Sequence, residues 1–150
     1  MNALIVYYSR TGTTKTVGEF LAKELDCPTL ELIDLTNRKG IIGYITGGRD
    51  AMQRKLTQIE KTNDNPFEYD LVIIGTPVWG ANMAPAVRTF LTQNPVKKVA
   101  FFCTAGSSVG ITFHEMEKLT CTPRGTLFLT TSEVKSNKFK EKAKDFAKKL

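Results

Sequence analysis

The first candidate for binding chemistry is a short polar segment near the amino terminus, residues 9–14 (SRTGTT). Hydroxyl side chains occupy four of its six positions, and the segment follows an apolar run and precedes a helical pattern. Helix N-termini carry unpaired N–H groups and a partial positive charge, so hydroxyls beside them complete an anion site. The segment lacks the G-x-x-x-x-G-K and G-x-G-x-x-G spacings. It therefore favours a phosphate-binding loop of another type, with an ordinary Thr-capped helix start as the alternative.

Two further segments are unusual, and each follows an expected strand. Residues 75–85 (GTPVWGANMAP) hold the only tryptophan, Trp79, between two glycines. A tryptophan in such a place can stack on a flat aromatic ligand, or it can close the edge of the core. Residues 104–110 (TAGSSVG) are small and polar, so a ligand could approach their backbone closely. This third segment indicates a ligand site only in combination with the other two.

The elements that must position these segments alternate between strand and helix. Continuous apolar runs predict strands covered on both faces, at residues 3–8, 30–33, 71–75, 99–104 and 126–131. Helical stripes lie between and after them: Val17, Phe20, Leu21 and Leu25; Ile45, Met52, Leu56 and Ile59; Ala86, Val87, Phe90 and Leu91 behind Pro85; residues 112–119; and Phe139, Ala143, Phe146 and Leu150.

This alternation predicts an α/β fold in one domain, residues 1–150. We expect a flavodoxin-like doubly wound, five-stranded parallel sheet with strand order 2-1-3-4-5 and three layers, α/β/α. In that order strands 1 and 3 are neighbours whose connections leave in opposite directions, which opens a crevice at their carboxyl ends. The three unusual segments should therefore meet at one edge of the sheet.

Composition narrows the class of protein. No apolar run reaches the ~18 residues of a membrane span. The amino terminus lacks the pattern of a signal peptide, so we expect a cytoplasmic protein that begins at Met1. Three cysteines without a C-x-x-C pair predict neither a disulfide framework nor a metal site. Of the net charge of +6, residues 135–150 contribute seven Lys against two acidic residues. That basic helix is either a solvated face or a docking patch for an acidic partner, and no nucleic-acid reader motif is present.

The sequence resembles the flavodoxin family and its relatives among flavin-dependent quinone reductases. The matching segments are residues 4–12 (LIVYYSRTG), 70–80 (DLVIIGTPVWG) and, more loosely, 101–106 (FFCTAG). The resemblance runs over essentially the whole chain and implies FMN as cofactor. It implies that the first loop holds the FMN phosphate, through Ser9, Arg10, Thr11, Gly12, Thr13 and Thr14. The other two loops would flank the flavin ring, through Thr76, Pro77, Val78, Trp79, Gly80, Thr104, Ala105, Gly106 and Gly110.

Within that resemblance, Trp79 would stack on or beside the ring, and Gly80 matches the glycine whose peptide rotates toward N5 of reduced flavin. The chain also departs from the family. The third loop lacks the aromatic residue that usually covers the outer ring face, and Ala81 and Asn82 stand where acidic residues often follow Gly80. Because negative charge near N1 disfavours the anionic reduced ring, its loss implies a less negative low potential.

The leading functional hypothesis is an electron carrier that exchanges one or two electrons with redox partner proteins, such as an acidic ferredoxin or a reductase, as a monomer or weak homodimer. The alternative is an NAD(P)H- or flavin-dependent reductase of quinones or small molecules. A non-redox module of the same fold is a third possibility. No catalytic acid or base and no metal ligand is predicted, because no carboxylate pair or Ser-His-Asp set is visible.

Overall fold

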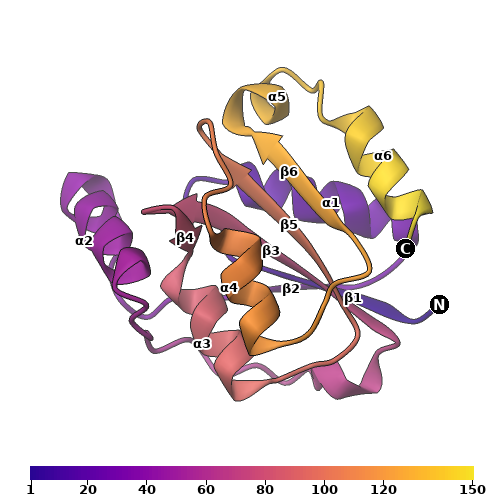
Figure 1. Ribbon diagram of the computed structural model, residues 1–150, viewed down its shortest axis with the longest axis horizontal. Helices are drawn as coiled ribbons and strands as arrows, with labels where there is room; N and C mark the ends of the chain where they lie inside the picture. Colours follow the sequence, from indigo (N-terminus) through magenta and orange to yellow (C-terminus); the bar gives the residue numbers. More distant parts are fainter.

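A computed structural model describes residues 1–150 and shows a twisted parallel sheet between two layers of helices (Figure 1). The sheet order is β2-β1-β3-β5-β6, and a short strand β4 (Asn82–Met83) pairs antiparallel with β3. This order confirms the predicted doubly wound arrangement, with β5 and β6 as the fourth and fifth parallel strands. The parallel strands are β1 (Ala3–Tyr7), β2 (Thr29–Glu31), β3 (Leu71–Trp79), β5 (Val99–Ala105) and β6 (Thr126–Thr130).

The helices divide between the two faces of the sheet. The first face is covered by α1 (Thr13–Leu25), α5 (Thr131–Lys135) and α6 (Lys140–Lys148), the second by α3 (Pro85–Gln93) and α4 (Thr112–Leu119). Alternate residues of β1 enter opposite cores: Ile5 packs in one and Leu4 in the other, both fully buried. The strands therefore had to be apolar at every position, which is why they were visible in the sequence.

The third strand runs further than predicted. A strand at 71–75 followed by a loop was expected, but β3 continues to Trp79 and turns back into β4, with Trp79 opposite Asn82. The two residues of the turn both have positive φ, 52° at Gly80 and 62° at Ala81. That is the backbone of the tight hairpin turn that matches strand twist. Pro77 concealed the strand, because proline within an apolar run normally argues against one.

The helix α2 (Gly40–Met52) contradicts the predicted stripe. Ile45 and Met52 are more than 60 % exposed, and Leu56 is exposed beyond the end of the helix. Ile59, also beyond the helix, forms an isolated bridge with Asp34. The residues that α2 buries are Gly43, Gly47 and Ala51. Small residues at intervals of four let the helix backbone lie close against its neighbours, so here the large apolar residues mark the outer face.

The carboxyl-terminal segment is two helices where one was expected. A capping box between Thr130 and Glu133 starts α5, and Asn137, at φ 60°, turns the chain before α6. The predicted apolar stripe is otherwise correct: Phe139, Ala143 and Phe146 are buried against the first face of the sheet.

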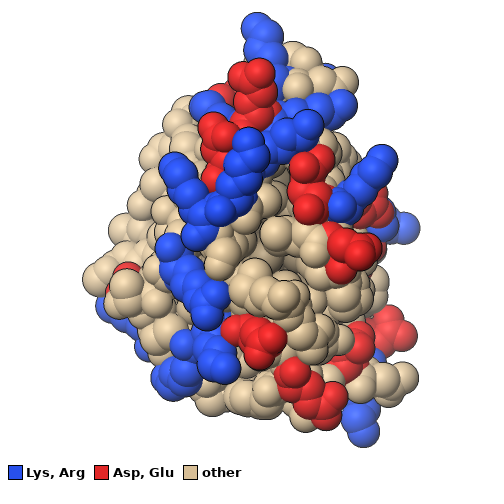
Figure 2. Space-filling model, turned by 90° about the vertical axis from the view of Figure 1, so that its right-hand side faces the viewer, with Lys and Arg blue, Asp and Glu red and all other residues tan.

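Figure 2 views the molecule from the side on which α6 lies. Lys and Arg side chains run in a band from the top of this face down its left side, and acidic side chains gather to the right and below. Acidic side chains also lie among the basic ones near the top of this face, so the face carries no uniform positive patch. No helix in the structure is both long enough and apolar enough to span a bilayer.

Candidate functional site

The three polar loops meet at the carboxyl edge of β1, β3 and β5. The first and third are joined by a hydrogen bond of 2.8 Å between the hydroxyls of Thr14 and Thr104, 90 residues apart in sequence. The second loop is held to the end of the third, because Ile111, the residue that follows the third loop, donates its N–H to the Ala81 carbonyl at 2.8 Å. The convergence that the strand order predicted is therefore present as direct contacts between the loops.

The first loop ends in an uncapped helix. Gly12, at φ 93°, precedes α1, and no side chain caps the helix N-terminus or places an acidic group in its first turn. The Ser9 hydroxyl accepts a hydrogen bond from the Gly12 N–H at 3.1 Å and so shapes the loop. A Cβ added at Gly12 would meet nothing within 4 Å, so the space before the helix is open. Thr11 is exposed and Thr13 half-buried at its rim.

Arg10 is engaged by the protein itself. Its Nε donates to the Arg38 carbonyl at 2.7 Å and its Nη2 to the Gly40 carbonyl at 2.9 Å. Its guanidinium also lies 5.7 Å from the centre of the Tyr44 ring. Arg10 therefore fastens the start of α2 to the first loop, a role the sequence did not suggest.

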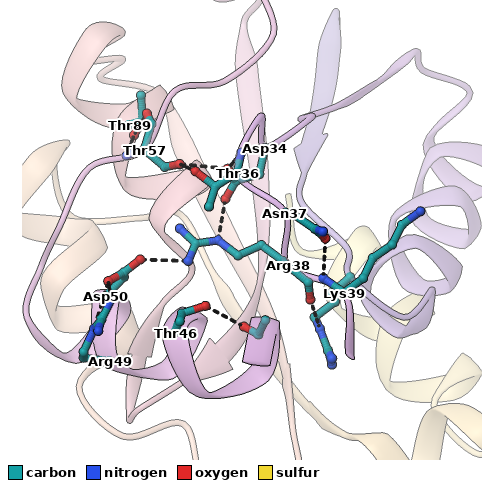
Figure 3. Close-up of polar contacts among 12 residues, drawn as sticks. Asp34, Thr36, Asn37, Arg38, Lys39, Thr46, Arg49, Asp50, Thr57 and Thr89 are labelled. Carbon is teal, nitrogen blue, oxygen red and sulfur yellow. Dashed lines mark hydrogen bonds and ion pairs between the residues drawn. The ribbon is translucent and has the colours of Figure 1, made fainter. Parts of the chain in front are cut away.

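A buried arginine fixes the rest of α2 (Figure 3). Arg38 is only 5 % exposed and reaches between two carboxylates, Asp34 at 3.1 Å and Asp50 at 2.7 Å. Burial on its own would lower the pKa of this guanidinium, but the hydrogen bonds to Asp50 and Asp34 outweigh burial and raise it. Because Asp50 belongs to α2, the ion pairs hold the helix against the segment that follows β2.

Trp79 stands where the second loop meets α2. Its ring lies edge-on to Tyr8, with centroids 5.4 Å apart, and its benzene part packs on Gly47, where an added Cβ would approach it to 2.8 Å. Burial, and next the nearby Asp34 charge, raise the pKa of Tyr8 to about 12. Thr76 is fully buried, and its hydroxyl donates to the Pro77 carbonyl and accepts from the backbone of Ala84, so it holds the hairpin in shape.

The remaining predicted residues lie around the same edge. Pro77 and Val78 are half-buried, Thr104 and Ala105 are buried, and Gly80, Gly106 and Gly110 are exposed. Gly110, at φ 56°, packs closely on Ala81, where an added Cβ would come within 2.4 Å of the carbonyl oxygen. The exposed residues of the third loop, Gly106, Ser107, Ser108 and Gly110, are all small.

Sequence reasoning missed the contribution of α2 and the segment before it. Residues 31–40 and the first loop enclose an open cavity of about 500 Å³, and α2 forms a second groove with the end of β3. The available signal was the series Gly43, Gly47 and Ala51, small residues at intervals of four that mark close helix packing.

The hydroxyl pair that ties the first and third loops gives a direct test of their contact. Thr14→Val should destabilise the fold by about 1–2 kcal/mol, because the buried Thr104 hydroxyl loses its partner. Thr14→Val combined with Thr104→Val should recover most of that loss, since no polar group is then stranded. Urea unfolding of the wild type, Thr14→Val, Thr104→Val and the double variant measures the coupling, and additive effects of the two substitutions would contradict it.

Known structures share this arrangement, although neither a family model nor a curated protein sequence matches the chain. A flavoprotein from Lactobacillus acidophilus, solved in complex with FMN, is 25 % identical with a TM-score of 0.72, over 90 % of this chain and 97 % of that one. A putative flavoprotein from Bacteroides uniformis is 20 % identical, with a TM-score of 0.77 over 98 % and 97 %. The Megasphaera elsdenii flavodoxin is 17 % identical, with a TM-score of 0.57 over 98 % of both chains.

The chain therefore has the flavodoxin-like fold, and its structural neighbours are flavodoxins and flavoproteins. The resemblance seen in the sequence is supported at the level of structure.

Proposed function

We propose that the carboxyl edge of the sheet binds FMN and that the protein carries electrons through it. One observation carries the proposal. The uncapped N-terminus of α1 is linked through the third loop to the hairpin that holds Trp79, at one edge of the sheet. The neighbour from Lactobacillus acidophilus, solved with FMN, supports the same cofactor here.

The donor set of the first loop fits a phosphate group. No side chain caps the first N–H groups of α1, the space around Gly12 is open, and Thr11 and Thr13, two residues with hydroxyls, flank Gly12 in the sequence. No acidic side chain stands in the first turn to repel an anion. We therefore assign the phosphate to Ser9, Thr11, Gly12, Thr13 and Thr14, with Arg10 bracing the loop from behind.

The ring is assigned to the second and third loops. When bound, FMN supplies a ring that accepts and releases one or two electrons. Trp79 would lie beside the ring, the Gly80 backbone at its edge, and Ala105 and Gly106 along its other side. The site needs no acid or base of its own, and Cys103 on β5 is fully buried, where burial raises the pKa of its thiol to about 12. These features support an electron carrier.

Comparing FMN with riboflavin tests the phosphate assignment. Flavin fluorescence titration should show one FMN per chain, with riboflavin at least about tenfold weaker, since even one charge-assisted hydrogen bond contributes ~1.5–3 kcal/mol. Thr11→Glu should weaken FMN about tenfold by charge repulsion and leave riboflavin unchanged. Thr29→Glu, the same change at the opposite edge of the sheet, is the control. Equal affinity for both flavins would contradict the phosphate site, and failure of both to bind would refute the proposed function.

The small third loop favours one second candidate, a reductase that acts on small molecules. Its exposed residues are glycines and serines, whose small size would leave a hydride donor access to the proposed ring. Stopped-flow mixing of the FMN-loaded protein with NADPH separates the two functions. A carrier should be reduced slowly by NADPH and rapidly by a redox partner such as an acidic ferredoxin or its reductase, whereas a reductase should be reduced rapidly by NADPH alone.

A further inference from the structure

A groove of about 420 Å³ separates the outer face of α2 from the end of β3. Tyr44 and Met52 stand on the helix side, and Val78 and Trp79 on the strand side. Its lining is mostly apolar and aromatic, and its volume is in the range of small-molecule sites, ~300–1,000 Å³. Tyr44 and Met52 are each more than 60 % exposed, so the groove opens to solvent.

Gly48, in the middle of this groove, has no explanation within the chain. Glycine inside a helix destabilises it by roughly 0.5–1 kcal/mol relative to alanine. Gly43 and Gly47 are required, because an added Cβ would approach the Arg38 carbonyl carbon to 2.1 Å and the Trp79 ring to 2.8 Å. At Gly48 an added Cβ would meet nothing within 4 Å. The absence of a side chain at Gly48 keeps the groove open.

The shape that results is a slot. Gly80, at φ 52°, faces Gly48 from the other side, and its own added Cβ would come within 2.6 Å of the Gly48 carbonyl oxygen. Two residues without side chains thus form the floor, and Tyr44 and Met52 on one side and Val78 and Trp79 on the other form the walls. A space between such walls suits a flat ring, which gains from stacking on Trp79 and from sulfur contact with Met52.

The slot has one charge at its rim, the Arg49 guanidinium. Its side chain is 56 % exposed, and its polar contacts are all with the Asp50 carboxylate, at 3.3 Å or more. Some of its N–H groups therefore face solvent. A carbonyl or anionic group on a ring compound would be met by this cation.

We propose that this slot binds a second ligand, a flat, apolar ring compound of two or three fused rings that carries a carbonyl or anionic group toward Arg49. It rests on the proposed function only in that the ring would then lie next to the FMN ring, on the far side of Trp79 from the third loop. Nothing in the slot itself depends on FMN.

Naphthalene-2-sulfonate is a suitable probe, because it is flat, anionic and inert toward thiols. Trp79 is the only tryptophan, so its indole N–H gives a single nuclear magnetic resonance signal that reports the slot directly. We expect a saturable shift of that signal at one probe per chain, in the presence of saturating FMN. Gly48→Leu should weaken binding at least tenfold by filling the floor, while Gln53→Leu, which places a leucine at the exposed end of α2 outside the groove, should not. Arg49→Gln should weaken the sulfonate severalfold and leave the uncharged naphthalene-2-methanol unchanged.

Each alternative result has a definite meaning. Absence of a saturable shift, or retention of binding by Gly48→Leu with an unchanged thermal midpoint, overturns the proposal. Displacement of the probe by FMN also overturns it, because the slot would then be occupied by the cofactor's own ring, while the proposed function would stand. Binding of the probe by a protein that takes up no FMN would refute the proposed function and leave the slot standing.

Discussion

Gly43→Ala should destabilise the protein by about 3 kcal/mol, the upper part of the usual range for overpacking. An added Cβ would lie 2.1 Å from the carbonyl carbon of Arg38 and 2.3 Å from its oxygen, and both are backbone atoms that cannot rotate aside. The same Arg38 oxygen accepts the hydrogen bond from Arg10. Displacing it would loosen the fastening between the first loop and α2 as well as the helix packing.

Gly48→Ala is the matched control, since it makes the same change five residues along the same helix. Because its Cβ meets nothing, it should stabilise the protein by about 0.5–1 kcal/mol through lower backbone entropy of the unfolded chain. Urea unfolding followed by the fluorescence of Trp79 measures both variants. A Gly43→Ala protein as stable as the wild type would mean that α2 does not lie against residue 38 as described.

The strands and the order of the sheet could be predicted because they obey a single strong rule. A strand that is covered on both faces of the sheet must be apolar at every position, as β1 is. The alternation of such strands with helices then leaves few possible topologies. The convergence of the three loops followed from that order alone. The first loop stood out in the sequence for the same reason, since its place directly after β1 distinguished it from an ordinary run of hydroxyl residues.

The packing of α2 could not be predicted, because it depends on glycines, which have no side chain. Periodicity detects large apolar residues, so it placed Ile45 and Met52 inward, whereas α2 packs through Gly43 and Gly47. The fastening of α2 by Arg10 was equally hidden, because a side chain that donates to distant carbonyls leaves no spacing in the sequence. These long-range contacts decide the shape of the site beside Trp79.

Glu115 should make the stability of the protein depend strongly on pH in the acid range. This carboxylate is about 5 % exposed and contacts three cations, Arg54 at 2.8 Å, Lys118 at 3.0 Å and Arg88 at 3.3 Å. Hydrogen bonds from Arg54 and Lys118 lower its pKa from 4.5 to about 2, against the opposing effect of burial. Arg88 in turn donates to the Asn82 side chain, so the cluster also holds β4 and the hairpin that carries Trp79.

The sign follows from the direction of that shift. The folded-state pKa is below the unfolded one, so the ionised carboxylate stabilises the fold above about pH 4.5, and this contribution is lost as the pH falls toward 2. A shift of this size corresponds to about 3 kcal/mol of folding free energy.

Glu115→Gln should lose a similar amount of stability at neutral pH, because Arg88 is left buried without its counter-charge. The stability of this variant should then fall less than that of the wild type between pH 5 and 2. Glu117→Gln, on the same helix, should behave as the wild type. Parallel acid profiles of the wild type and Glu115→Gln, measured by urea unfolding at each pH, would show that the three cations do not hold this carboxylate ionised.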